Sequence, residues 1–215
     1  MTMRPDILTL IVIAANVLGS VMALPQAIAI VRTRNTLGIS PTWVAISTAI
    51  NVWWVVYGFG IADKAIIPVA VVSFGAYSVI AVALVRCSPA SVRASAPGMA
   101  AATAAVAVAP LLALTAGGWS AAGITLGALY AAQLTPAVVT VYRAHDVSGV
   151  SAATWLIAWT EALLWGAYGI PKLDAGLITL SATGIVMASL VLIRLYLRRP
   201  RGVSGLTTVP LSASI

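Results

Sequence analysis

The chain has 215 residues, of which 61% are hydrophobic and only 8% are charged. Soluble domains usually contain about 25% charged residues, so this composition excludes a soluble globular enzyme and a disordered protein. The mean hydropathy of +1.04 instead predicts an all-α, multi-pass membrane protein. One cysteine and one histidine exclude an internal disulfide and a multi-histidine metal site. We expect no metal and no cofactor.

The net charge of +7 would point to nucleic acid in a soluble protein. Here the basic residues lie in short polar breaks and at the C-terminus, without a basic helix face. We therefore expect no nucleic-acid partner and interpret the charge as a marker of the cytoplasmic side.

Seven apolar segments follow one another, and each is long enough to approach the ~20 residues of a membrane span. They cover residues 7–31, 42–59, 65–85, 98–116, 121–142, 152–170 and 175–193. The breaks between them are rich in Gly, Pro, Asn and Asp, which favour turns. The Gly, Ser, Thr and Pro content of residues 201–215 predicts a disordered tail. A cleaved signal peptide is not expected, because the first apolar run is too long.

An internal repeat is the strongest pattern in the chain, since residues 111 positions apart match without a gap. Both copies contain Trp-x-x-Tyr-Gly followed by an aspartate. The matching pairs include Pro25/Pro136, Arg32/Arg143, Ser40/Ser151, Trp54/Trp165, Tyr57/Tyr168, Gly58/Gly169 and Asp63/Asp174. The pattern predicts a first three-helix repeat at 7–86, a linker helix at 98–116 and a second repeat at 121–197.

The linker crossing decides the relative orientation of the repeats. Three helices begin and end on opposite sides, so one additional crossing makes the two copies parallel. With seven crossings and the N-terminus outside, nine basic residues lie on the cytoplasmic side and three outside. Without the linker crossing the distribution would be five against seven. The positive-inside rule favours seven crossings, with a cytoplasmic C-terminus, in a plasma membrane or bacterial inner membrane.

The first copy carries Leu24-Pro25-Gln26, then the segment 32–40, then Trp54-x-x-Tyr57-Gly58. These motifs resemble a PQ-loop repeat of the SWEET and SemiSWEET sugar transporters. The resemblance covers roughly residues 10–86 and 121–197. It implies two parallel three-helix bundles joined by a linker helix, and transport of small sugars by alternating access.

Pro25 and Pro136 each remove a backbone donor inside a helix. They form either a static kink or a hinge, and the resemblance favours the hinge. Gln26 could satisfy backbone groups that the first proline frees. Val21 and Ala132 precede the prolines by four positions, so they either select a ligand by size or pack as small residues between helices.

Trp54 and Trp165 are expected either in an interfacial aromatic belt or on opposite sides of a substrate cavity, where the family has its sugar site. The family also places an asparagine in the third helix of each repeat. The corresponding positions here are Ala70 and Ser181, so this chain departs from the family in that feature.

Asn51 and Glu161 precede the tryptophans by three and four positions, which puts them on the same helix faces. Glu161 is the only acidic residue deep in an apolar segment. An ionisable side chain there costs at least ~2.5 kcal/mol and usually faces protein or water. It is either a packing glutamate or a site for proton coupling or a cationic substrate.

Asp63, Lys172 and Asp174 lie in the breaks after the second helix of each repeat, close to Tyr57 and Tyr168. The aspartates resemble the acidic residues of an outer gate, and Asp63 could pair with Lys172 across the repeats. The alternative is solvated loop charge, since exposed ion pairs contribute only ~0–1 kcal/mol.

The sequence thus predicts a sugar facilitator. The alternatives are a proton-coupled carrier of amino acids or another small polar solute that uses Glu161, and a membrane receptor or scaffold without transport. An enzyme is not expected, because Glu161 has no acid–base partner in the apolar segments. The expected partners are a small-molecule substrate, the lipid bilayer and a second copy of the chain.

Overall fold

The computed structural model describes residues 4–36, 39–147 and 150–198, and all regular structure in these ranges is helical. Gly38, Gly149 and the predicted tail at 201–215 lie outside the described residues. The elements are α1 (Pro5–Thr33), α2 (Pro41–Gly60), the 3-10 turn η1 (Lys64–Ile66), α3 (Ile67–Cys87), α4 (Pro89–Arg143), α5 (Ala152–Gly169) and α6 (Ala175–Leu197).

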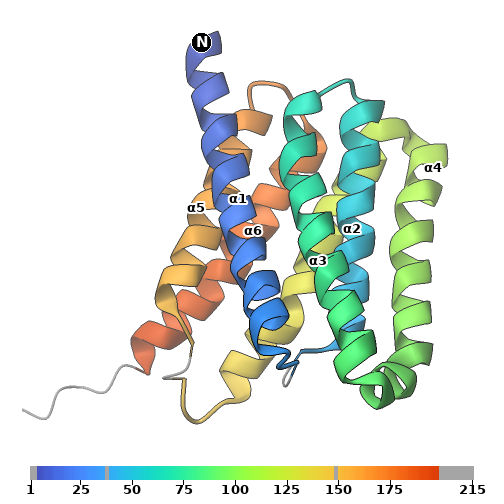
Figure 1. Cartoon of the computed structure of the whole chain (residues 1–215). Helices are drawn as coiled ribbons and strands as arrows, with labels where there is room; N and C mark the ends of the chain where they lie inside the picture. The colour runs from blue at the N-terminus through green and yellow to red at the C-terminus, as the bar shows by residue number, and fades with distance from the viewer. Residues whose placement is uncertain (1–3, 37–38, 148–149, 199–215) are drawn as a thin grey trace, which may run out of the picture.

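The described ranges contain six α-helices rather than seven separate ones, because the predicted segments 98–116 and 121–142 are joined in α4. Helix α4 also begins earlier than expected, at Pro89. Within it, Gly117 and Gly118 leave the helical conformation, and Gly118 has a φ of 67°, which glycine adopts without steric cost. Figure 1 shows α4 reversing its direction at the top of the molecule. Two glycines are therefore enough to turn the chain, and no longer loop is needed.

Among the described residues, five helical segments are long and apolar enough to cross a membrane: α1, α2, η1 with α3, α4 and α6. Large apolar side chains on their outer faces are exposed, among them Leu10 and Phe59. A soluble monomer rarely exposes this much contiguous apolar surface. The structure therefore fits a multi-pass membrane protein.

The helices pack in a regular order. Helix α3 contacts both α1 and α2, and α6 contacts both α4 and α5. The two groups meet where α1 packs on α5 and where α2 packs on α4. These contacts place the N-terminal part of α1 beside the C-terminal part of α5, where Val12 and Ala15 share a buried cluster with Trp165.

Helix starts are capped in the same way in both halves. Ser40 and Ser151, which are 111 positions apart, accept hydrogen bonds from the third amide of α2 and α5. Asp63 and Asp174 cap η1 and α6 by accepting from Ala65 and Leu177. Such side-chain caps satisfy amides that have no partner inside the helix. They also fix the two aspartates at one end of the molecule.

Candidate functional site: a Tyr–Asp closure above a central cavity

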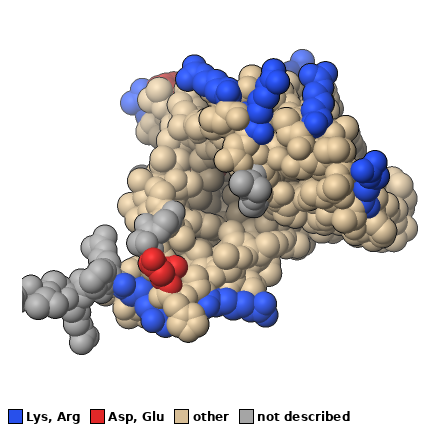
Figure 2. All heavy atoms as spheres, turned by 60° about the horizontal axis from the view of Figure 1, so that its bottom comes forward, with Lys and Arg blue, Asp and Glu red and all other residues tan. Residues whose placement is uncertain are grey.

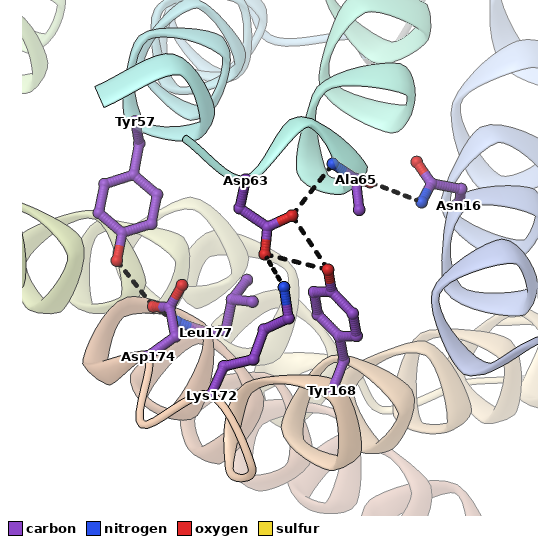
Figure 3. Close-up of polar contacts among 8 residues, drawn as sticks. All are labelled: Asn16, Tyr57, Asp63, Ala65, Tyr168, Lys172, Asp174 and Leu177. Atoms are coloured by element: carbon purple, nitrogen blue, oxygen red, sulfur yellow. Dashed lines mark hydrogen bonds and ion pairs between the residues drawn. The ribbon is translucent and has the colours of Figure 1, made fainter. Parts of the chain in front are cut away.

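Two tyrosine–aspartate pairs connect the two halves of the chain. The Tyr57 hydroxyl donates to Asp174 Oδ1 over 2.7 Å, and the Tyr168 hydroxyl donates to both oxygens of Asp63 over 3.0 Å. Each bond joins a tyrosine of one repeat to the aspartate of the other (Figure 3). Hydrogen bonds to a charged acceptor are stronger than neutral ones. These residues, together with Lys172, form what we call the Tyr–Asp closure.

Lys172 adds an ion pair to one side of this closure. Its Nζ lies 2.6 Å from Asp63 Oδ2 and 4.5 Å from the centre of the Tyr168 ring. The cross-repeat pair that the sequence predicts is therefore present. Burial opposes the charge on Lys172, but hydrogen bonds with Asp63 and Tyr168 raise its pKa above the ordinary value. The position that corresponds to Lys172 in the first half is Ile61.

The backbone repeats the same turn before each aspartate. Ala62 and Leu173 both have left-handed φ values, 57° and 53°. The amide of Asp63 donates to Gly58 O over 2.9 Å, and that of Asp174 donates to Gly169 O over 3.0 Å. Non-glycine residues with such φ values are uncommon and often lie at functional sites. The two loops thus present their carboxylates in equivalent ways.

A central cavity of about 110 Å³ lies next to the closure. At ~10–15 Å³ per water site, it has room for several waters or for part of a small solute. The lining side chains and backbone atoms come from both halves of the chain: Gly19, Met22, Ile50, Asn51, Trp54, Ile66, Val69, Ala70, Ser73, Tyr77, Tyr130, Gln133, Glu161, Ala162, Trp165, Leu177 and Leu180. At the end opposite the closure the surface is hollowed, with basic side chains around the hollow (Figure 2); the lysines of the chain, Lys64 and Lys172, lie at the closure end instead.

The lining follows the internal repeat. Fourteen of the seventeen lining residues form seven pairs separated by 111 positions. The tryptophans Trp54 and Trp165 are one such pair, and each makes an edge-on contact with the closure tyrosine of its own helix, with ring centroids 5.6 and 6.3 Å apart. The cavity therefore lies on the approximate symmetry axis that also relates the two halves of the closure.

The polar side chains that line the cavity do not recur at the equivalent positions, 111 residues away, in the other half of the chain. Among the described residues that line the cavity, Glu161 is the one carboxylate and no Lys, Arg or His is present, and the paired position holds Ile50. The Trp165 indole donates to Glu161 Oε1 over 3.2 Å. Gly19 lies directly against the Glu161 carboxyl, so that a Cβ at this position would overlap it. The Glu161 carboxyl thus accepts a hydrogen bond from the Trp165 indole and packs against Gly19. It has no cationic partner among the described residues.

A second set of polar contacts lies at the other side of the cavity. Gln133 donates to the Ser47 hydroxyl over 2.8 Å, and both side chains are buried. Asn51 donates to the Ser47 carbonyl over 2.8 Å. The amide oxygens of Gln133 and Asn51 are therefore available as acceptors, while their nitrogens are engaged with the protein.

Asn16 connects α1 to the start of α3. Its side-chain nitrogen donates to Ala65 O over 3.0 Å, and its oxygen accepts from Val69 N over 2.9 Å. These two backbone groups would bond to each other in a regular helix. The asparagine amide thus replaces one helical hydrogen bond where η1 passes into α3 (Figure 3).

The predicted substrate residues are partly brought together. Trp54, Trp165, Asn51, Glu161 and Ala70 line the cavity. Ser181 is buried with its hydroxyl against Gly166, beside the lining residues. Val21 and Ala132 are exposed and are not among the lining residues.

The predicted hinge residues lie on exposed helix surface. Pro25 and Gln26 are exposed within α1, and Pro136 is exposed within α4. The sequence interpretation missed Tyr130 and Gln133 as lining residues. The signal was available, because they lie 111 positions after Gly19 and Met22.

Comparison of the chain with protein-family models, with curated proteins and with solved structures finds no match. The fold and the site define a helical protein with several helices able to span a membrane, a polar closure at one end and a mixed cavity between two groups of helices.

Proposed function

We propose that the chain is a membrane transporter that moves small sugars down their gradient by alternating access, with the layout of the SWEET and SemiSWEET transporters. The observation that carries this proposal is the pair of crossed Tyr–Asp hydrogen bonds next to a cavity whose walls are paired across the repeat. An alternating-access cycle has an end state that is closed on one side of the membrane and open on the other. The closure at one end and the hollow at the other fit such a state.

The helix contacts support two parallel bundles. In each group the third helix lies between the other two, and the first helix of one group contacts the second helix of the other. The reversal at Gly117 and Gly118 divides α4 into two arms, each longer than the ~20 residues of a span. Counting both arms gives seven crossings, with the first arm as the linker.

We further propose that the closure faces the outside of the cell and that the hollow faces the cytoplasm. Arg34, Arg86 and Arg143 belong to the end opposite the closure, whereas Lys64 and Lys172 lie beside it. The positive-inside rule then gives an external N-terminus and a cytoplasmic C-terminus. A lipid bilayer and a second copy of the chain remain the proposed partners besides the solute.

In this mechanism the prolines let the cytoplasmic halves of α1 and of the second arm of α4 move. Pro25 and Pro136 break the helical hydrogen-bond ladder at equivalent positions of the two repeats. Opening of the Tyr–Asp closure would accompany closing of the cytoplasmic end, and the sugar would lie between Trp54 and Trp165.

One observation favours a second candidate, a carrier of a cationic or protonated small solute. Glu161 lines the cavity without a cation among the described residues, and an unpaired carboxylate in low dielectric needs a proton or a counter-ion. A sugar does not supply a charge, whereas an ammonium group or a proton does.

The deciding experiment is glucose counterflow in proteoliposomes at equal pH on both sides. The sugar proposal predicts counterflow above that of empty liposomes and a loss of at least about tenfold in Trp54→Ala, since the indole supplies stacking area. Trp53→Ala is the matched control, because Trp53 is adjacent on α2 but lines an apolar groove between α2, α3 and α4.

Absence of counterflow from folded protein would contradict the sugar proposal. Uptake of an amine or amino acid driven by an imposed pH gradient, and lost in Glu161→Gln, would instead support the second candidate. If neither solute moved while labelled solute still bound to the protein, the receptor alternative would replace both.

A further inference from the structure

The two aspartates of the Tyr–Asp closure differ in how their oxygens are satisfied. Asp63 uses both oxygens, which accept from Tyr168, Lys172 and the Ala65 amide. Asp174 accepts from Tyr57 and the Leu177 amide, both at Oδ1. Its Oδ2 is buried and has no hydrogen-bond partner among the described residues. In Figure 3 this oxygen points away from Tyr57, toward the space between the two loops.

A single sequence difference explains the unsatisfied oxygen. Lys172, which pairs with Asp63, corresponds to Ile61 in the first half, and Ile61 lines the same pocket as Asp174. Within the described residues, ion pairs join Arg4 to Asp6 and Lys172 to Asp63. No basic side chain of these residues forms an ion pair with Asp174.

The closure therefore holds two carboxylates and one ammonium group. A charged oxygen that is buried without a partner is among the costliest polar groups in a protein. Asp174 is only 8% exposed, so bulk water does not solvate it freely. A positive charge at this oxygen would remove the deficit and complete the symmetry with the Asp63–Lys172 side.

We propose that the pocket beside Asp174 binds a small monovalent cation, which takes at Asp174 the part that Lys172 takes at Asp63. The pocket has a volume of about 420 Å³, and Ser120 lines it together with Asp63 and Lys172. Because the Lys172 ammonium is bonded to Asp63, one of the two carboxylates in the pocket keeps an uncompensated charge. Hard cations take oxygen ligands, with waters completing the shell.

We propose a monovalent ion because a single carboxylate oxygen of the closure, Asp174 Oδ2, lacks a hydrogen-bond partner among the described residues. The described residues contain no cluster of three acidic, histidine or cysteine side chains, so the donor set suits neither calcium nor a transition metal. The bound ion would stabilise the closed form, in which Tyr57 and Asp174 are in contact. This inference concerns the closure and does not depend on which solute the cavity takes.

The test measures thermal unfolding in lipid nanodiscs while Na⁺ replaces N-methyl-D-glucamine at constant ionic strength. A ligand that binds the folded state raises Tm in a saturable way. For the wild-type chain we expect a rise of roughly 2–4 °C. A parallel titration with K⁺ distinguishes a size-selective site from one that accepts any alkali ion, and the proposal requires saturation with at least one of them.

Three variants test the location of the site. Asp174→Asn keeps the cap for Leu177 but lacks the charge, so its Tm should not respond to the ion. Ile61→Lys supplies an internal ammonium group, so it should also lose the response and should match or exceed the wild-type Tm without Na⁺. Asp6→Asn is the control, because this carboxylate is exposed and does not line the pocket, and it should retain the response. A wild-type Tm that ignores both ions, or an unchanged response in Asp174→Asn, would overturn the proposal.

Discussion

The Tyr–Asp closure and the central cavity are neighbours on the same approximate symmetry axis, but they use that symmetry differently. In the closure, the tyrosines and aspartates recur 111 positions apart, so that the Tyr57–Asp174 bond is repeated as Tyr168–Asp63, and Lys172 alone has a different counterpart, Ile61. In the cavity, the tryptophans recur, but the other paired positions hold different residue types, such as Glu161 paired with Ile50.

Under the proposed function, this difference in symmetry corresponds to two tasks, contact between the moving halves and binding of the solute. A closure between two halves that move against each other needs matched contacts, so that both sides form and break together. A cavity that receives a small asymmetric solute gains nothing from symmetry, because the solute presents different groups to its two sides. Under the proposed function, the repeated Tyr–Asp bonds would be the moving contacts, the repeated tryptophans would supply a shared stacking surface, and the divergent positions, such as Glu161, would select the ligand.

The largest effect is expected from Asp63→Ala, because this carboxylate accepts bonds from Tyr168, Lys172 and the Ala65 amide. Hydrogen bonds to charged groups contribute ~1.5–3 kcal/mol each, while the half-exposed lysine adds less. We expect the free energy of unfolding to fall by roughly 3 kcal/mol, measured by thermal unfolding in nanodiscs. Asp6→Ala is the control, since its pair with Arg4 is exposed, and an equal loss there would refute the role of Asp63.

Gly19→Ala probes the cavity side of the comparison. A Cβ at Gly19 would lie 2.6 Å from Val69 Cγ2 and would overlap the Glu161 carboxyl. Overpacking of this kind costs typically ~1–3 kcal/mol, so α1 should be displaced from α5 and the Tm should fall. Gly75→Ala is the matched control, because a Cβ there meets nothing within 4 Å; if both variants behave alike, the contact with Glu161 is not constraining.

The two closure tyrosines should not be equivalent when each is changed to phenylalanine. Tyr57→Phe leaves Asp174 with the Leu177 amide alone, whereas Tyr168→Phe leaves Asp63 with Lys172 and Ala65. We expect a loss of about 1.5 kcal/mol for Tyr57→Phe and a smaller one for Tyr168→Phe. Equal losses in thermal unfolding would show that Lys172 does not compensate.

The smallest effect is expected from pH. The folded-state pKa of Lys172 is above its ordinary value of 10.5, so its stabilisation is fully present below that value and is lost as the pH rises through the folded-state pKa. Lys172→Met should lower the free energy of unfolding by at most ~1 kcal/mol at about pH 8, because the side chain is partly exposed. This difference should shrink as the pH rises above 10.5 and through the folded-state pKa, and a constant difference would assign the effect to packing.

The sequence predicts much of the closure because its members are rare residue types that recur at one spacing. Tyr57, Tyr168, Asp63 and Asp174 follow from that spacing, and the lysine pair follows from loop position. What the spacing alone does not predict is which oxygen each donor reaches. That depends on the left-handed turns at Ala62 and Leu173, two residue types that seldom adopt such a conformation.

The cavity is predicted less completely, for a geometric reason. Val21 and Ala132 precede the prolines by four positions and are exposed, while Met22 and Gln133 precede them by three and line the cavity. Successive residues differ by about 100° around a helix, so one position decides between lipid and cavity. The seven predicted segments form six α-helices in the described residues, because residues 117 and 118 alone reverse the chain within α4.

Helix α1 contacts α3 in two different ways, before and after Pro25, and Asn16 makes the first of these contacts. Through its bonds to Ala65 and Val69 the segment before the proline is fastened to α3, so any rotation of that segment carries the third helix with it. The segment after Pro25 contacts the same helix through apolar side chains, since Ala27 and Ile30 are buried in one cluster with Ala76, Ile80 and Leu84. Apolar contacts have no preferred direction, so this second contact tolerates a sliding of the helices that the directional bonds of Asn16 do not.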